Sequence, residues 1–343
     1  MTEQEFASTQ PLKPIPEQET DERLAPAREQ HAPLAVPSSL WGAFTLIARF
    51  EMAVALSIPV VVGAVMGWWQ IGSFSTVTFL FTFVSVFAAA LGINLLHEYH
   101  DFLRSREQET RAVDEPFVTG YGMMAAGAIE PLVVRGMAHI LLALAFVCNL
   151  WLTLLAGWPV LCFAGFAFLL AYFYAVPPIH YGYRGWGLGS IGVFLCCGLL
   201  QTTGSYYVQS GTLGWLPIWA SVPLGLLVMV TFLHYNIIHY RRDWALRNRT
   251  LAVTLGLERA LDLSALFTVL AYVTILMMVA LTPAPLWALI SLGAMPIALG
   301  PFANVRRDQL SPNDCFNLYG AVVSATILTG LLLGLGFWAD KIF

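Results

Sequence analysis

Residues 74–101, FSTVTFLFTFVSVFAAALGINLLHEYHD, decide the fold, because an apolar run long enough to cross a bilayer ends in polar and ionisable side chains. A membrane-spanning helix needs about 20 mostly apolar residues. A second apolar stretch ends in the same way, at Asn236–Asp243 (NIIHYRRD). Ionisable groups at membrane depth are costly and by default indicate a functional site. The clusters Asn94–Asp101 (NLLHEYHD) and Asn236–Asp243 therefore predict a site at the ends of two spans.

The composition of the whole chain agrees with a membrane protein. Hydrophobic residues make up 58% of the 343 positions and charged residues only 11%, too few for the surface of a soluble domain. We expect an all-α polytopic membrane protein with about nine transmembrane helices around a central cavity that opens laterally to lipid. The expected spans lie near residues 43–68, 74–97, 132–156, 158–176, 187–209, 213–236, 260–281, 284–303 and 316–338.

The basic residues predict the orientation. With nine spans, all thirteen Lys and Arg between the first and last spans fall on one side, and the opposite connections carry none. Because basic loops stay inside, this side is expected to be cytoplasmic, with the amino terminus inside and the active-site loops facing the cytoplasm. We expect location in the inner (cytoplasmic) membrane.

The chain divides into two parts. Residues 1–40 contain six prolines and no apolar period, so we expect a disordered cytoplasmic tail, and residues 41–343 form the transmembrane domain. The first span starts too late and is too long for a cleaved signal peptide. The five cysteines lie in or beside apolar spans without CxxC spacing, which indicates neither a disulfide framework nor a zinc site.

The first cluster has the pattern of a hard-cation site. On a helix, Asn94, Glu98 and Asp101 fall within about 60° of one another and form an oxygen-rich stripe. Magnesium prefers one or two carboxylates together with substrate phosphate oxygens and water. The simpler interpretation is a set of polar residues solvated at the membrane surface, which one cluster alone would favour.

The second cluster repeats the pattern. Asn236, Tyr240 and Asp243 are expected to share a helix face, with His239 at its edge, and arginines follow at once. Basic side chains beside a metal site suit an anionic group with many oxygens, such as a diphosphate. Two clusters beside long basic loops therefore favour a shared site over two solvated helix ends.

Several motifs resemble the UbiA superfamily of intramembrane prenyltransferases over nearly all of residues 41–338. Within it, the branch that prenylates 1,4-dihydroxy-2-naphthoate for menaquinone synthesis is the most similar. Asn94, Glu98 and Asp101 stand where the family has N-x-x-x-D-x-x-D, and Arg249–Gly256 (RTLAVTLG) is similar to that branch's (K/N)RTLAVRLG. Further similar segments are Arg49 with Pro59 and Gly63, Tyr172–Pro178 (YFYAVPP), Tyr183–Gly189 (YRGWGLG) and Gly204–Gln209 (GSYYVQ).

The resemblance implies an Mg2+-dependent enzyme that transfers a polyprenyl group from polyprenyl diphosphate to an aromatic acceptor. It implies that loss of diphosphate leaves an allylic cation, which the acceptor ring attacks with loss of its carboxylate. The lipid bilayer is the expected environment, a nucleic-acid partner is not expected, and the oligomeric state stays open. The expected residues are, for the metal, Asn94, Glu98, Asp101, Asn236 and Asp243; for diphosphate, Arg49, Arg104, Arg184 and Arg242; and for catalysis, Asp101, Asp243 and His239.

Four positions depart from the family pattern. Glu98 replaces an aspartate, His239 stands where the second motif's first aspartate is expected, Ile238 replaces an arginine, and Ser190 occupies an acidic position. Imidazole is a poor magnesium ligand, so one metal ion is favoured while two stay open. Prenyl chain length and the acceptor stay open too. Alternatives are another acceptor, cyclisation of the cation as in terpene cyclases, or a transporter or non-catalytic membrane subunit.

Overall fold

A computed structural model describes residues 40–107, 119–305 and 310–343, and the regular elements in these ranges are all helical. Apart from Leu40, the predicted cytoplasmic tail lies outside these residues, as do three of the thirteen basic positions, Arg111, Arg306 and Arg307. Helices are expected of a membrane protein, because they satisfy every backbone hydrogen bond within one segment.

Eight described segments are long and apolar enough to cross a membrane, and α8 is a shorter apolar helix of 17 residues. Their positions agree with the nine predicted stretches to within a few residues at most ends. They are α4 (Phe50–Ile71), α5 (Thr76–Glu107), α7 (Pro131–Ala156), α8 (Pro159–Ala175), α9–η2–α10 (Leu188–Val193, Phe194–Leu200, Gln201–Ser210), α11 (Trp215–Ile238), α14 (Leu257–Leu281), η3–α15 (Leu286–Ala294, Met295–Asn304) and α16 (Pro312–Ile342).

Two predicted boundaries were wrong, and both errors fall at the polar end of the molecule. The first predicted span is divided into α3 (Leu40–Ile47) and α4, because Arg49 has left-handed backbone angles of φ 51° and ψ 57°. Helix α5 continues ten residues beyond the predicted end at 97, so the whole first cluster is helical. At 1.5 Å per residue, its 32 residues extend about 48 Å, well beyond the bilayer's hydrocarbon thickness of about 30 Å.

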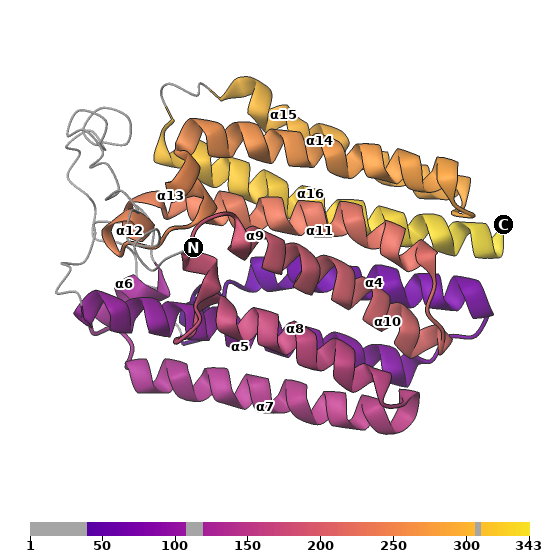
Figure 1. Cartoon of the computed structure of the whole chain (residues 1–343), viewed down its shortest axis with the longest axis horizontal. Coiled ribbons are helices and arrows are strands. Elements are labelled where there is room, and N and C mark those ends of the chain that lie inside the picture. Colours follow the sequence, from indigo (N-terminus) through magenta and orange to yellow (C-terminus); the bar gives the residue numbers. More distant parts are fainter. Residues whose placement is uncertain (1–39, 108–118, 306–309) are drawn as a thin grey trace, which may run out of the picture.

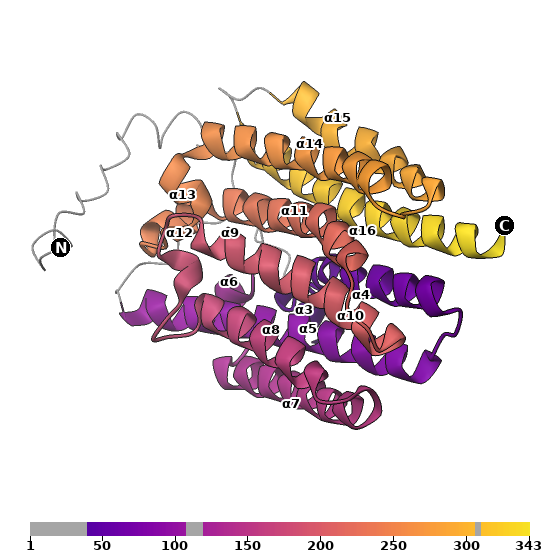
Figure 2. The same ribbon diagram turned by 45° about the vertical axis from the view of Figure 1, so that its right-hand side comes forward.

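The long helices run side by side in three groups (Figures 1 and 2). α14, α15 and α16 form one flank and α5, α7 and α8 the other, with α4, α10 and α11 between them. Helix α4 contacts both flanks, since it packs on α5 and on α16. Helix α11 packs on α14 and α16, and α10 packs on α5 and α8. The buried side chains of these contacts form the apolar core.

Helices α4 and α10 approach closely because two glycines face α10. A Cβ atom on Gly63 would lie 2.3 Å from the Thr202 carbonyl oxygen, and one on Gly67 would lie 2.6 Å from the Gln209 Cβ. Small residues four apart are a common means of close helix packing in membranes. This contact fixes α10, and with it one wall of the cavity described below.

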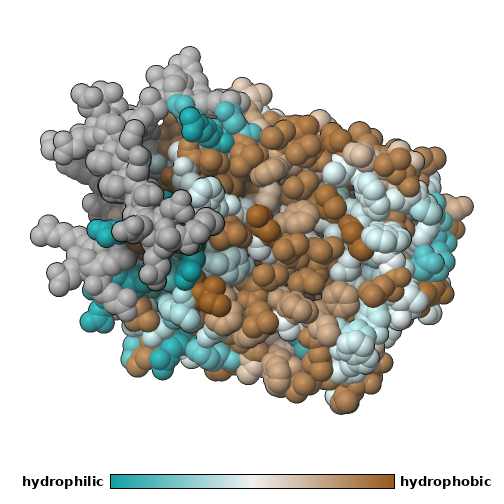
Figure 3. All heavy atoms as spheres, in the orientation of Figure 1, coloured by the Kyte–Doolittle hydropathy of each residue, from teal (hydrophilic) through white to brown (hydrophobic). Residues whose placement is uncertain are grey.

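The polar residues of the bundle gather at one end. The C-terminal part of α5 lies there with three short helices, α6 (Gly120–Ala125), α12 (Tyr240–Ala245) and α13 (Leu251–Leu255) (Figure 1). The surface between the two ends is largely hydrophobic on the face seen in Figure 3. At the other end, Trp69 donates from its indole nitrogen to Asp340 (2.9 Å). An apolar belt between polar ends is the surface of a multi-pass membrane protein.

Candidate active site at the polar end of an apolar cavity

The two clusters meet in space, as the sequence predicted, although 142 positions separate Asp101 from Asp243. The Arg104 guanidinium forms an ion pair with Asp101 and also donates to the Asn248 side-chain oxygen (2.8 Å). Asn248 in turn donates from its amide nitrogen to Asp243 (3.0 Å). Because Asp101 and Asp243 are both about 97% buried or more, this chain of contacts forms the interior of a polar site rather than a solvated surface.

Glu98 is surrounded by donors from four segments. Its Oε1 pairs with Arg49 and accepts the Tyr235 hydroxyl (3.0 Å). Its Oε2 accepts the Tyr121 backbone N–H (2.7 Å) and lies 3.9 Å from Arg242. Both oxygens are therefore engaged by the protein itself, and the side chain is 2% exposed.

Arg242 joins two acidic residues of α5, Glu98 and Asp101. Its Nη2 lies 3.5 Å from the Asp101 Oδ2, and its Nη1 faces Glu98. The side chain is 2% exposed, which is unusual for arginine and requires compensation by buried carboxylates. Arg49, Arg104 and Arg242 thus face the three acids Glu98, Asp101 and Asp243, and the formal charges of these six groups balance.

Local backbone geometry turns these side chains inward. Left-handed angles are rare outside glycine and cluster at functional sites, and Arg49 adopts them at the turn between α3 and α4. Its guanidinium lies over the Tyr235 ring, 4.0 Å from the centroid, a favourable cation–π contact. The turn therefore directs Arg49 toward Glu98 and α11.

The second cluster does not form one continuous helix face, and that prediction was wrong. α11 ends at Ile238 and α12 begins at Tyr240, with His239 between them at φ −95° and ψ 19°. Arg242 and Asp243, which follow the interruption, are both buried, and Arg242 lies against the acids of α5. His239 itself is buried, and its ring lies 4.3 Å from that of Tyr235.

The loop after α8 covers the site. Tyr183 donates from its hydroxyl to Asp101 (3.4 Å), and Arg104 lies over its ring, 4.3 Å from the centroid. Burial and the neighbouring Asp101 carboxylate raise the pKa of Tyr183 well above its usual value, so its hydroxyl stays protonated and can donate. The Arg249 N–H donates to the Tyr183 carbonyl oxygen (3.0 Å), which joins this loop to the one after α12.

The remaining candidate residues occupy different positions. Asn94 is buried, its amide nitrogen donates to the Ala48 carbonyl (2.8 Å), and the residue lines the cavity described next. Asn236 is buried and lines a small pocket together with Tyr174. Arg184 is exposed, lies in the covering loop and donates to the Pro178 carbonyl (3.0 Å).

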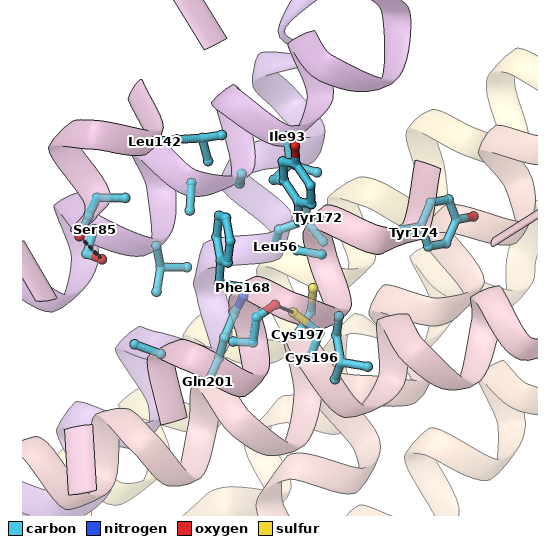
Figure 4. Close-up of a pocket in the computed structure, with 18 of the residues that line it drawn as sticks. Leu56, Ser85, Ile93, Leu142, Phe168, Tyr172, Tyr174, Cys196, Cys197 and Gln201 are labelled. Atoms are coloured by element: carbon cyan, nitrogen blue, oxygen red, sulfur yellow. Dashed lines mark hydrogen bonds between the residues drawn. The ribbon is translucent and has the colours of Figure 1, made fainter. Parts of the chain in front are cut away.

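An apolar cavity of about 800 Å³ begins at this polar end. Its walls come from α4, α5, α7, α8, the α9–η2–α10 span and α11, so it lies between the central helices and the flank of α5, α7 and α8. Asn94, His97 and Tyr174 line it near the polar cluster, and Ser85 lies at the opposite end from Tyr174 (Figure 4). Its size and apolar lining suit a long hydrocarbon chain.

The donor atoms present fit a magnesium ion held jointly with a substrate. Asp101 and Asp243 supply carboxylate oxygens, and Asn94 and Asn236 supply amide oxygens. Among the described residues there is no group of three or more His, Cys, Asp or Glu side chains that could hold a metal by themselves. Magnesium requires few protein ligands when phosphate oxygens and water complete its octahedron, so the set fits one such ion.

Several site residues were missed at the level of sequence. Tyr235, Asn248, Tyr183 and the Tyr121 N–H all contact the buried acids or their arginines. Tyr235 and Asn248 lie one and five residues from members of the second cluster, so proximity to a polar cluster was an available signal. Tyr121 gave none, because it acts through its backbone.

Comparison with known proteins agrees with this architecture. The model of the UbiA prenyltransferase family matches residues 56–324. Two similar curated proteins are both named 1,4-dihydroxy-2-naphthoate octaprenyltransferase. The one from Mycobacterium leprae is 28% identical over 72% of this chain and 77% of its own length, and the one from Escherichia coli is 26% identical over 82% and 90%.

The fold is also that of solved structures. A UbiA homologue from Archaeoglobus fulgidus, bound to GPP and Mg2+, superposes with a TM-score of 0.60 over 84% of this chain and 99% of that chain, at 14% identity. A digeranylgeranylglyceryl phosphate synthase superposes with a TM-score of 0.54 at 17% identity, over 87% and 98%. With the family model matching most of its length, the chain belongs to the UbiA prenyltransferase family and is a multi-pass membrane prenyltransferase.

Proposed function

We propose that this prenyltransferase transfers a polyprenyl group from polyprenyl diphosphate to 1,4-dihydroxy-2-naphthoate, in menaquinone synthesis, and depends on Mg2+. The observation that carries the proposal is the meeting of the Asn94–Asp101 and Asn236–Asp243 clusters at the polar end of an apolar cavity of about 800 Å³. The names of the similar curated proteins favour this acceptor.

The donor would lie with its diphosphate at the polar cluster and its hydrocarbon chain in the cavity. Arg242, which is buried, and Arg49 and Arg104, which are largely buried, are cations available to neutralise the diphosphate, and Arg184 is an outer contact on the covering loop. Asp101 and Asp243, with Asn94 and Asn236, would hold one Mg2+, which when bound neutralises diphosphate charge as a Lewis acid. The cavity walls keep water from the reacting carbon.

The bond changes follow from the reactants. The donor's C1–O bond breaks and its electron pair leaves with diphosphate, while a ring carbon of the acceptor forms the new carbon–carbon bond. The acceptor's carboxylate leaves as carbon dioxide, so the ring regains its aromaticity. Arginine side chains that are already in place, in a site without water, stabilise the negative charge that develops on diphosphate, and no side chain has to move for this. His239, whose ring lies beside that of Tyr235, would hydrogen-bond diphosphate or serve as a base.

Glu98 has a different part in this proposal from the one that the family motif implies. Each of its two oxygens already accepts a hydrogen bond, from Arg49 and Tyr235 on one and from the Tyr121 N–H on the other. The Asp101 Oδ2, by comparison, faces Arg242 at 3.5 Å. We therefore propose that Glu98 acts by positioning Arg49 and Arg242 rather than by binding the metal.

We further propose that the polar end faces the cytoplasm and that the protein lies in the inner membrane. The bias of thirteen basic residues toward one side supports this orientation. A membrane-impermeant maleimide applied to intact cells should label a Leu213→Cys variant, at the opposite end, and should label Arg106→Cys only after permeabilisation. The reverse pattern would overturn the orientation.

The activity test uses membranes that contain the protein, a polyprenyl diphosphate and the naphthoate acceptor, with and without Mg2+. We expect a prenylated, decarboxylated product identified by mass, and rescue of a menaquinone-deficient strain. A product formed without acceptor would favour cyclisation of the cation, and transfer to another ring would favour another acceptor. Absence of product with every acceptor and of rescue would favour a transporter or non-catalytic subunit.

A further inference from the structure

His97 is a buried side chain whose ring nitrogen has no protein partner. It lies on α5 between Asn94 and Glu98 and is 4% exposed. Its Nε2 is buried without a hydrogen bond, and the residue lines the apolar cavity. Leaving a buried polar atom unpaired is costly, so such an atom in a native protein requires an explanation, such as a ligand.

The ring is held in a fixed orientation. It stacks on Tyr174, with centroids 5.1 Å apart and planes 21° apart, and Tyr174 lines the same cavity. Tyr174 also lines a small pocket together with Asn236 of the second cluster. His97 therefore stands at the boundary between the charged cluster and the apolar cavity, where a prenyl C1 atom and an attacking ring would meet.

A comparison with other histidines shows that His97 differs from them in its surroundings. His234 is also buried with both ring nitrogens unpaired, but it packs against Phe302 and lines no part of the cavity. His139 lines the cavity, but it is exposed and its Nδ1 contacts the Arg135 carbonyl oxygen (2.7 Å). Among the described histidines, His97 alone combines burial, an unpaired nitrogen and a place in the cavity wall.

The chemistry of the substrates indicates which group would hydrogen-bond to the His97 Nε2. A prenyl chain has no hydrogen-bonding group, and the diphosphate is drawn to Arg49, Arg104 and Arg242, none of which lines the cavity. The neutral imidazole Nε2 either donates or accepts, according to its tautomer, and a hydroxyl group complements both forms. An aromatic acceptor with a ring hydroxyl would supply that group at the polar end of the cavity, where His97 lies.

We propose that His97 binds a ring hydroxyl of the aromatic acceptor and so orients the attacking carbon, with Tyr174 holding the imidazole in place by stacking. This inference rests on the proposed function, since it requires a hydroxylated aromatic acceptor. It makes His97 a substrate-binding residue that determines which acceptors are used, separate from the arginines and acids that hold the diphosphate.

The test compares hydroxyl and methoxy acceptors. Steady-state transfer is measured with 1,4-dihydroxy-2-naphthoate and its two monomethyl ethers at saturating donor, for the wild type, His97→Phe and His97→Gln. We expect the wild type to prefer the free hydroxyl over one of the ethers by about tenfold in kcat/KM, the worth of one hydrogen bond. His97→Phe should lose that preference, and His97→Gln should recover part of it.

Controls separate a binding effect from misfolding. His139→Phe, on the same cavity wall, should keep the wild-type preference, and so should His234→Phe, which tests loss of a buried imidazole elsewhere. The KM of His97→Phe for the donor should stay within about twofold of the wild-type value, because His97 is not among the residues proposed to bind the diphosphate. Because the preference is a ratio for one enzyme, a lower yield of folded protein does not affect it.

The outcomes are distinguishable. If the wild type transfers to the naphthoate and its hydroxyl-over-methoxy preference equals that of His97→Phe, this inference is overturned and the proposed function stays intact. An ordered water bound to the His97 Nε2 would give that result. If His97→Phe is inactive, the same comparison is made with the smaller apolar variant His97→Leu, whose unchanged ratio would also overturn it. A wild type without activity on any hydroxylated aromatic acceptor overturns the proposed function instead.

Discussion

Replacing Glu98 by glutamine removes one negative charge from a buried cluster while keeping the size of the side chain. The carboxylate faces Arg49 and Arg242, whose side chains are 8% and 2% exposed. Removing one partner of a buried ion pair costs about 3–5 kcal/mol, because the other charge is left uncompensated. Asp101 still lies 3.5 Å from Arg242, so Arg49 bears most of the loss, and we expect a destabilisation of about 3 kcal/mol, the lower end of that range.

Unfolding in mixed micelles with SDS, followed by tryptophan fluorescence, measures this free energy. The cycle consists of Glu98→Gln, Arg49→Gln and the double variant. The double variant should be less destabilised than the sum of the single variants by about 1–3 kcal/mol, as for residues in one buried network. Glu51→Gln, an exposed acid on the same part of α4, is the matched control and should stay within about 0.5 kcal/mol of the wild type.

The same variant distinguishes a positioning residue from a metal ligand. The Mg2+ concentration for half-maximal transfer should stay within about twofold for Glu98→Gln and rise by about tenfold or more for Asp101→Asn. Additive free energies in the cycle would refute the ion-pair account. An equal rise in the Mg2+ requirement for both variants would refute the assignment of Glu98 to the arginines.

Three further predictions concern the site, the packing and the cavity. Asp101→Ala or Asp243→Ala should each lower prenyl transfer by about 100-fold or more while Glu51→Gln does not, and turnover like the wild type would reject the site assignment. Gly63→Ala should destabilise the fold by about 1–3 kcal/mol in the SDS assay, because its Cβ would lie 2.3 Å from the Thr202 carbonyl. Gly136→Ala, with nothing within 4 Å, should not, and equal effects would contradict the close α4–α10 contact. Ala89→Phe, which places a ring in the cavity, should raise the KM of long donors by about tenfold relative to short ones, as product mass and kinetics would show. An unchanged dependence on chain length would place the prenyl chain elsewhere.

The spans and the first polar cluster could be predicted from the sequence, because they depend on residues that are neighbours along the chain. The apolar stretches predicted the spans to within a few residues, since crossing a bilayer fixes the length and composition of each segment. The stripe of Asn94, Glu98 and Asp101 was predictable from the helical repeat, and α5 is helical through all three. The departures at Arg49 and His239 were not readable, because each is a single-residue break held in place by contacts with other helices.

The sequence by itself determined an all-helical membrane protein with two polar clusters at the same end, because hydropathy, helical period and charge placement are local or additive properties. The tertiary structure decided which atoms meet: Arg104 with Asn248, Glu98 with Arg49 and Tyr235, and His97 with Tyr174. These pairs come from different segments of the chain, so their contact depends on how helices pack and where loops return. Burial then sets the energies, since the same charges would interact weakly in water and strongly inside the bundle.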